Sequence, residues 1–180
     1  MVPETPLDLL QSMREQAQDL AAQKLSYSTQ SAGIKNIAYV VNGVHFYCEA
    51  GLIKEVSVCE NLMPVPQTKN WLRGLVNSKG TLYSVSDLSL LAGFDRPVLA
   101  NKGHLLLVND EQSQSALLVN RVIGFRYFEE NQRLGNLESK QNTLDGLSAF
   151  VKTGYHVDGV DWFCLDIVSL LESEQFREIQ

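Results

Sequence analysis

Residues 34–48 alternate between apolar and other side chains with the period of two that is typical of β-strands. The dipeptide Asn42-Gly43 interrupts this alternation, and such a pair supplies the positive φ angles that a tight type I′ turn requires. The apolar positions that share one face are Ile37, Tyr39 and Val41 before the turn and Val44, Phe46 and Cys48 after it. The pattern therefore predicts a β-hairpin.

Short apolar stretches separated by turn residues continue to residue 165. The turn signals include Asn77-Ser78-Lys79-Gly80 and Asp158-Gly159, and residues 129–146 read as a long polar loop. No amphipathic helix separates the strands, which favours a barrel or sandwich over a βαβ arrangement. We predict an all-β fold with two small β-barrels side by side. The further strands are expected at residues 53–58, 75–76, 81–85, 105–108, 115–119, 122–128, 147–153 and 160–165.

The first residues of the chain carry the signals of a helix. Thr5, Pro6 and Asp8 form an N-terminal capping pattern, and apolar residues then recur every three to four positions. We expect a helix over residues 1–25 and a polar, flexible linker over residues 26–33. The main domain should then cover residues 34–176.

Two similar junctions between a strand and a helix divide this main domain. Asp87 is expected to cap a short helix that ends at Gly93, and Asp166 to cap a final helix over about residues 166–178. In both places an aliphatic residue follows the Asp, and a leucine lies three positions further on. We therefore place a first subdomain at about residues 34–97 and a second at about residues 98–165.

The size and composition are those of one globular domain or two small subdomains. The chain has 180 residues, 44% of them hydrophobic, and a mean hydropathy of -0.09. No apolar run approaches the roughly 18 residues of a membrane span, and residues 1–10 lack the basic and apolar order of a signal peptide. We expect a soluble, cytoplasmic protein without direct membrane insertion.

The charge pattern argues against a nucleic acid partner. The net charge is -6, and no cluster of Lys or Arg forms the stripe that a polyanion requires. Acidic residues gather in residues 148–180, where six acids are accompanied by two basic residues. This tail would suit a basic partner surface, although a solvated helix face is the simpler explanation.

The sequence contains no residue pattern typical of a metal site, a cofactor site or a catalytic centre. His45 and Cys48 are three positions apart on a predicted strand, so they should point to opposite faces. The acidic neighbours Glu49 and Glu60 disfavour the lowered thiol pKa that a cysteine enzyme needs. We expect no enzyme activity, no metal and no cofactor. The three cysteines, which lack CxxC spacing, are Cys48, Cys59 and Cys164.

Segments in the first half of the main domain resemble, in sequence order, the signature of the CheW family. They are Ile53-Lys54-Glu55-Val56, Trp71 to Gly80 and Val85-Ser86-Asp87-Leu88, and the resemblance covers roughly residues 34–172. It implies two five-stranded β-barrels without catalytic activity. It also implies an adaptor that couples the cytoplasmic tip of a methyl-accepting chemoreceptor to the regulatory domain of a CheA-like histidine kinase. Later segments that continue the resemblance are Leu117 to Gly124, Val151 to Gly154 and Leu165-Asp166-Ile167.

The N-terminal segment narrows the resemblance to one branch of the family. Pro6-Leu7-Asp8-Leu9-Leu10 and Leu20-Ala21-Ala22 resemble the PilI-type adaptors. That branch implies a chemosensory system for type IV pilus twitching motility, and a place at membrane receptor arrays through partners. A flagellar chemotaxis CheW is an alternative, and a CheV fragment is disfavoured because no receiver domain follows. A nucleic-acid-binding β-barrel is a remote alternative, because its aromatic platforms would have to lie among basic residues.

The resemblance also implies a partner-binding surface. Exposed aliphatic side chains rimmed by charge suit this role, but Ile53 and Val56 also fit a barrel core, and by alternation only one of them can face inward. Lys79 stands where the family usually has Arg, so it lacks the fork that binds a carboxylate with two parallel hydrogen bonds. Asn120 replaces a commoner Asp, and the local sequence alone favours an ordinary turn at Asn77-Ser78-Lys79-Gly80. The implied partner-binding residues are Ile53, Glu55, Val56, Asn77, Lys79, Asn120 and Arg121.

Deletion of residues 1–25 should leave the melting temperature nearly unchanged, because a flexible linker is expected to separate the predicted helix from the main domain. Differential scanning fluorimetry of the full-length and truncated proteins measures the difference. Insolubility or a much lower melting temperature of the truncated protein would show that the helix belongs to the core.

Overall fold

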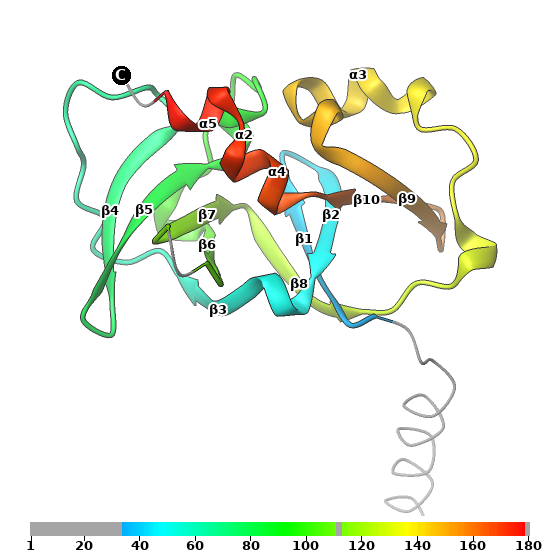
Figure 1. Cartoon of the computed structure of the whole chain (residues 1–180), viewed down its shortest axis with the longest axis horizontal. Helices are drawn as coiled ribbons and strands as arrows, with labels where there is room; N and C mark the ends of the chain where they lie inside the picture. Colours follow the sequence, from blue (N-terminus) through cyan, green and yellow to red (C-terminus); the bar gives the residue numbers. More distant parts are fainter. Residues whose placement is uncertain (1–33, 111–112, 179–180) are drawn as a thin grey trace, which may run out of the picture. The chain divides into compact units, whose positions relative to one another are not determined.

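The computed structural model describes residues 34–110 and 113–178. The helix expected over residues 1–25 and the linker expected over residues 26–33 lie outside the described residues. Strands are the main regular structure of the remaining chain, with short helices between and after them (Figure 1). The predicted all-β fold class is confirmed.

Ten strands form two five-stranded sheets in the described part of the chain. Hydrogen bonding in the first sheet follows the order β8-β1-β2-β10-β9, and in the second sheet β3-β6-β7-β5-β4. The ladder of each sheet does not join its first strand to its last, so the predicted β-barrels are not closed. Two isolated bridges, Met63 with Leu75 and Arg133 with Tyr155, each add one residue pair at an outer strand. The strands are β1 (Asn36–Val41), β2 (Val44–Glu49), β3 (Ile53–Val58), β4 (Leu72–Ser78), β5 (Thr81–Asp87), β6 (His104–Val108), β7 (Ser115–Val119), β8 (Arg121–Arg126), β9 (Val151–Val157) and β10 (Val160–Leu165).

The two sheets do not divide the sequence near residue 97, as the expected subdomain boundary would require. The hairpin of β1 and β2 joins β8, β9 and β10, while β3 to β7 form the second sheet. The reason is the parallel pairing of β10 with β2, in which Phe163 lies opposite Phe46. This pairing is formed between distant parts of the sequence, so local turn signals cannot reveal it.

The two sheets repeat one arrangement. In each sheet, the third and fourth strands of the strand order pair parallel, and the other three neighbouring pairs are antiparallel. The likeness between the Asp87 and Asp166 segments belongs to this repeat. Asp87 follows β5 and caps α2 (Leu88–Leu91), and Asp166 follows the corresponding strand β10 and caps α4 (Ile167–Glu172).

Three hairpins turn through the positive-φ pairs that the sequence suggested. Asn42 and Gly43 have φ angles of 47° and 85°, Lys79 and Gly80 have 53° and 85°, and Asp158 and Gly159 have 52° and 77°. Both central residues of a type I′ turn need positive φ, which costs Gly little and a lysine more. Asn77 assists the second turn, because its side-chain oxygen accepts a hydrogen bond from the Gly80 amide at 2.9 Å.

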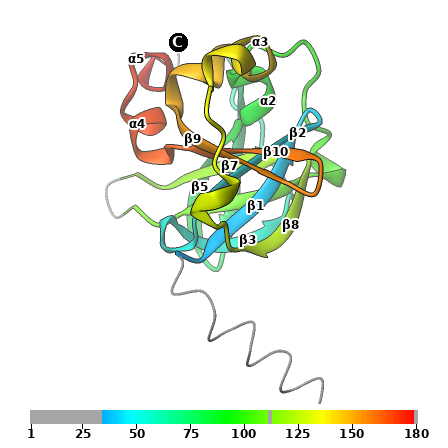
Figure 2. The same ribbon diagram turned by 90° about the vertical axis from the view of Figure 1, so that its right-hand side faces the viewer.

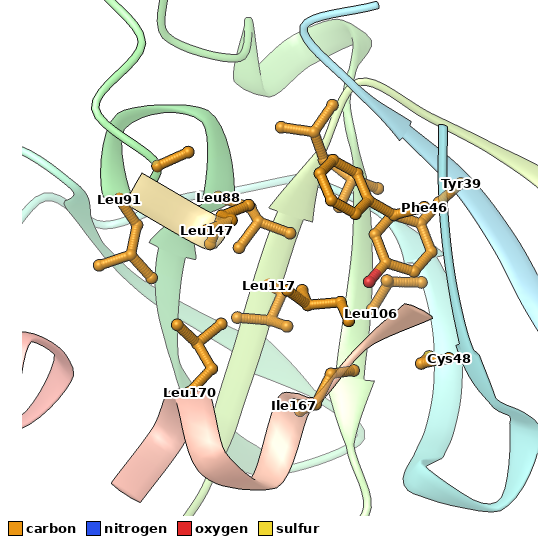
Figure 3. Close-up of a cluster of buried hydrophobic side chains, with 14 of the residues drawn as sticks. Tyr39, Phe46, Cys48, Leu88, Leu91, Leu106, Leu117, Leu147, Ile167 and Leu170 are labelled. Atoms are coloured by element: carbon orange, nitrogen blue, oxygen red, sulfur yellow. The ribbon is translucent and has the colours of Figure 1, made fainter. Parts of the chain in front are cut away.

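The main hydrophobic core lies between the two sheets. The first sheet contributes Tyr39 and Phe46, and the second contributes Leu106 and Leu117 (Figure 3). Each sheet also buries its other face, against separate clusters around Tyr83 in the second sheet and around Tyr47 and Trp162 in the first. Burial of both faces explains why β6 and β7 read as continuous apolar runs. The core residues from the helical segments include Leu88, Leu91, Leu147, Ile167 and Leu170.

The short helices α2, α3 (Gln141–Leu144), α4 and α5 (Glu174–Arg177) gather at one end of the described domain (Figures 1 and 2). The single final helix expected over residues 166–178 is interrupted, because Ser173 is extended and caps α5 as a new N-terminus. The ring of Phe176 stacks on Trp71 at 5.4 Å. No helix in the described ranges has the length and apolarity needed to cross a membrane.

The expected polar loop contains short helical turns, and the strand after it starts later than predicted. The turns η3 (Glu130–Gln132), η4 (Glu138–Lys140) and η5 (Asp145–Phe150) lie before β9. Leu147, which was expected in the strand, lies in η5 and is fully buried in the main core. Its apolar character therefore reflects core packing and not strand pairing.

Asp87 joins several parts of the second sheet through one buried carboxylate. Its side chain is fully buried and forms an ion pair with Arg73 at 2.7 Å. The Val98 amide donates to the same oxygen at 2.9 Å, while the Ser89 and Leu90 amides donate to the other. Burial raises the pKa of Asp87, and the hydrogen bonds from Val98, Leu90 and Arg73 oppose that rise.

Asp87→Ala should lower the free energy of unfolding by about 3–5 kcal/mol, because it removes a buried partner of Arg73 and a helix cap together. Urea unfolding followed by circular dichroism measures the change. Glu130→Ala is the control, since it removes an exposed ion pair with Arg133 and should cost under about 0.5 kcal/mol. A loss below about 1 kcal/mol in Asp87→Ala would contradict the central role of this carboxylate.

Candidate functional site

An open groove of about 550 Å³ lies where the edges of the two sheets meet. Two of the strands that line it, β3 and β8, lie at the end of the domain opposite α2, α3 and α5 (Figure 1). We call it the inter-sheet groove. Its lining comes from the start of β1, the turn η1 (Ala50–Leu52), the first half of β3 and the end of β8, and consists of Lys35, Ile37, Ala50, Gly51, Ile53, Lys54, Glu55, Val56 and Phe125. Three of the sequence-predicted site residues, Ile53, Glu55 and Val56, are therefore brought together here.

Ile53 and Val56 lie on opposite sides of the core boundary. Ile53 is only 9% exposed and belongs to the main core, whereas Val56 is 39% exposed. The alternation of strand positions therefore directs Ile53 inward, although a bulge interrupts the pairing of β3 with β6 between Ile53 and Glu55. Ile53 therefore belongs to the core, and Val56 is available on the surface for partner contact.

Glu55 and Lys79 form an intramolecular ion pair at the surface. Lys79 Nζ lies 2.7 Å from Glu55 Oε2, and the lysine side chain is 78% exposed. Glu55 is on β3 and Lys79 is in the β4–β5 turn, so the pair links the two opposite edges of the second sheet. Such a contact requires the sheet to curl, because its two outer strands must approach each other. The bridge between Met63 and Leu75 also pairs the chain that follows β3 with β4.

Phe125 is the prominent groove residue that the sequence reading missed. Its ring is 59% exposed, and the ammonium of Lys35 lies 3.7 Å from the ring centroid. Gly124 precedes it with a φ of 123° and faces Ala38 where a bulge shifts the pairing of β8 with β1. A glycine followed by an aromatic residue in an edge strand is the local signal that indicates such a bulge.

Asn120 and Arg121 lie elsewhere, at the other end of β1. Arg121 pairs with Val40, whereas Phe125 pairs with Ile37 near the groove. The side-chain oxygen of Asn120 accepts a hydrogen bond from the Asn42 amide at 2.7 Å and so ties the β7–β8 connection to the first hairpin turn. The predicted site residues on β3 and those at Asn120 and Arg121 thus form two groups, separated by most of the length of β1. Asn77 instead stabilises the turn that contains Lys79.

The thiols and histidines of the described ranges show no arrangement for catalysis. Burial raises the pKa of Cys48 to about 12, and burial also raises the pKa values of Cys59 and Cys164. His45 packs against Trp162 while Cys48 lies in the main core, which confirms that they face opposite ways. Within residues 34–110 and 113–178, no three His, Cys, Asp or Glu side chains gather closely enough to hold a metal ion.

Comparison with known proteins places this geometry in one family. The family model of the CheW-like domain matches residues 37–175. Protein PilI of Pseudomonas aeruginosa is 25% identical over 125 residues, which cover 69% of this chain and 70% of that protein. The crystal structure of the scaffolding protein TtCheW from Thermoanaerobacter tengcongensis is similar with a TM-score of 0.67 at 18% identity, over 81% of this chain and 92% of that one. At this identity the likeness to TtCheW shows the fold alone.

The two aliphatic residues should respond differently to truncation. Ile53→Ala should lower the free energy of unfolding by about 2–4 kcal/mol because it leaves a cavity in the main core. Val56→Ala should change it by under about 1 kcal/mol because the side chain is largely outside the core. Urea unfolding of both variants gives the comparison, and equal losses would contradict the assignment of Val56 to the surface.

Proposed function

Because the chain belongs to the CheW-like domain family, we propose that it is a non-catalytic adaptor in a chemosensory system. In this role it couples the cytoplasmic tip of a methyl-accepting chemoreceptor to the regulatory domain of a CheA-like histidine kinase. The similarity to PilI favours a type IV pilus system over a flagellar one. The protein then works in the cytoplasm, at membrane receptor arrays that it reaches through its partners.

The observation that carries this proposal is the inter-sheet groove. An adaptor needs a surface that loses water on binding and still discriminates between partners. The groove offers the exposed side chains of Val56 and Phe125 together with the charged residues Lys35, Lys54 and Glu55. A helical segment with an apolar face and flanking charges matches this combination.

The Glu55–Lys79 pair contributes selectivity to the groove. Because Lys79 is exposed, the pair adds little to folding stability. A partner that supplies its own charge can compete for Glu55 or Lys79 and exchange the internal contact for one across the interface. Lysine suits such an exchange, since a single ammonium on a flexible chain is less fixed in geometry than a guanidinium fork.

Charge reversal of the pair should weaken partner binding without unfolding the protein. Glu55→Arg and Lys79→Glu are each expected to lower partner affinity by about tenfold or more, and to change stability by under about 0.5 kcal/mol. Titration of the purified kinase regulatory domain and the receptor cytoplasmic tip, with melting curves alongside, measures both effects.

Glu130→Arg and Arg133→Glu provide matched controls, because they reverse the charges of another exposed ion pair outside the groove. The double variant Glu55→Lys/Lys79→Glu preserves the internal pair with its polarity exchanged, so it separates loss of the pair from loss of partner recognition. If both groove variants bind both partners with unchanged affinity, the interface is not at this groove.

Affinity capture from a native lysate tests the adaptor role itself. Recovery of a CheA-like kinase and a methyl-accepting receptor with the tagged full-length protein is the expected result, and the identity of the kinase separates a pilus system from a flagellar one. Recovery of neither component would reject the adaptor proposal.

A further inference from the structure

A second groove, of about 290 Å³, opens beside the β1–β2 turn. Its walls come from residues 96–103, which include the turn η2 (Ala100–Lys102), and from the two asparagines that link the first hairpin to the β7–β8 connection. The residues that carry the argument are Asn42, Arg96, Pro97, Leu99, Lys102 and Asn120. We call this the basic groove.

The charges that line the basic groove all have one sign. Arg96 and Lys102 are exposed and are the charged residues in its lining. Neither forms an ion pair with an acid of the described ranges, and Asp95, the acid next to Arg96 in the sequence, does not line the groove. In a chain with a net charge of -6, two unpaired cations in one concavity leave a positive charge that this domain does not neutralise. Among residues 34–110 and 113–178, the Arg and Lys side chains that form ion pairs with acids are Arg73, Lys79, Arg133, Lys140 and Lys152.

The backbone that carries these cations is held firmly. The Val98 amide donates to the buried Asp87 carboxylate, and its carbonyl accepts from Arg73 at 3.2 Å. The Arg96 carbonyl accepts a hydrogen bond from the Ser89 hydroxyl at 2.6 Å. A Cβ on Gly103 would meet Leu118 and Val98 side-chain atoms at 2.8 Å, so this end of the wall is closely packed as well. A binding surface fixed in this way loses little conformational entropy when a ligand binds.

The basic groove also offers an apolar contact beside its charges. Leu99 is 58% exposed in its lining, between Arg96 and Lys102 in the sequence. A ligand that matches the groove must therefore bring negative charge to both sides of an apolar side chain. Carboxylates supply that charge, and they form strong charge-assisted hydrogen bonds with a guanidinium.

We propose that the basic groove binds an acidic segment of a partner protein. Carboxylates of that segment pair with Arg96 and Lys102, and an apolar side chain between them packs on Leu99. The inference rests on the proposed adaptor function, since it names the chemistry of one of the surfaces that an adaptor presents.

The position of the basic groove suits binding that is simultaneous with the inter-sheet groove. Asn42 lies just after the last residue of β1, whereas Lys35, just before β1, and Ile37, its second residue, line the inter-sheet groove. A ligand in one groove therefore leaves the other open. Asn120 and Arg121, which the family resemblance suggested as partner contacts, adjoin the basic groove and not the inter-sheet groove.

Fluorescence anisotropy with the full-length protein tests the proposal. The probe is a fluorescein-labelled peptide with glutamates on both sides of one leucine, and its counterpart carries glutamine in place of every glutamate. We expect the acidic peptide to bind and the glutamine peptide not to bind at equal concentration. Binding should weaken steeply with added salt, because exposed ion pairs are screened.

Arg96→Glu/Lys102→Glu should lower affinity for the acidic peptide by about tenfold or more. Lys69→Glu is the matched control, because Lys69 is an exposed lysine outside the basic groove, and it should leave affinity unchanged. Amide chemical shifts of the wild-type protein, followed by NMR during the titration, should change at Asn42, Leu99 and Lys102.

Equal binding of the glutamine peptide, no binding of the acidic peptide, or unchanged affinity in the double variant would overturn the proposal. Chemical shift changes confined to residues outside the basic groove would overturn it too. The assay contains neither kinase nor receptor, so a negative result here is distinct from failure of the adaptor proposal, which lysate capture decides.

Discussion

The buried carboxylate of Asp87 is the interaction on which the architecture of the second sheet depends. A fully buried charge is stable only when donors replace the water that it has lost. Here Arg73 from β4, the Val98 amide and two amides of α2 supply them. One side chain thereby fixes the end of β5, the start of a helix that enters the main core, and the wall of the basic groove.

The inter-sheet groove depends on a different constraint, the packing of two sheets against one core. Tyr39 and Phe46 from one sheet meet Leu106 and Leu117 from the other (Figure 3). The groove forms at the margin of this packing, where β1 and β8 of the first sheet approach β3 of the second. Its floor is core, through Ile37 and Ile53, and its rim is charged and aromatic. The packing of the two sheets therefore both holds the floor of the groove in place and leaves its rim accessible.

These features together suit an adaptor. The fold supplies two concave surfaces at opposite ends of β1, one apolar with mixed charges and one basic. Of the three thiols, Cys48 and Cys59 are buried and Cys164 is partly buried, and burial raises the pKa of each. Such surfaces suit recognition, which agrees with membership of the CheW-like domain family.

Local features of this protein were determined by its sequence alone. The alternation around Asn42-Gly43 predicted a hairpin, and Asp87 and Asp166, each followed by an aliphatic residue, predicted two helix caps. The ordered segments from Ile53 to Leu88 indicated the family. Each depends on residues close together in the chain, where φ preference, capping and side-chain period act directly.

Only the tertiary structure decided which strands share a sheet, which of Ile53 and Val56 is exposed, and how Phe125 completes a groove. The parallel pairing of β2 with β10 joins residues far apart in the sequence, and a single bulge changes which side chains reach the surface. Such pairings are selected by the burial of both faces of both sheets, a property of the assembled core that no short segment contains.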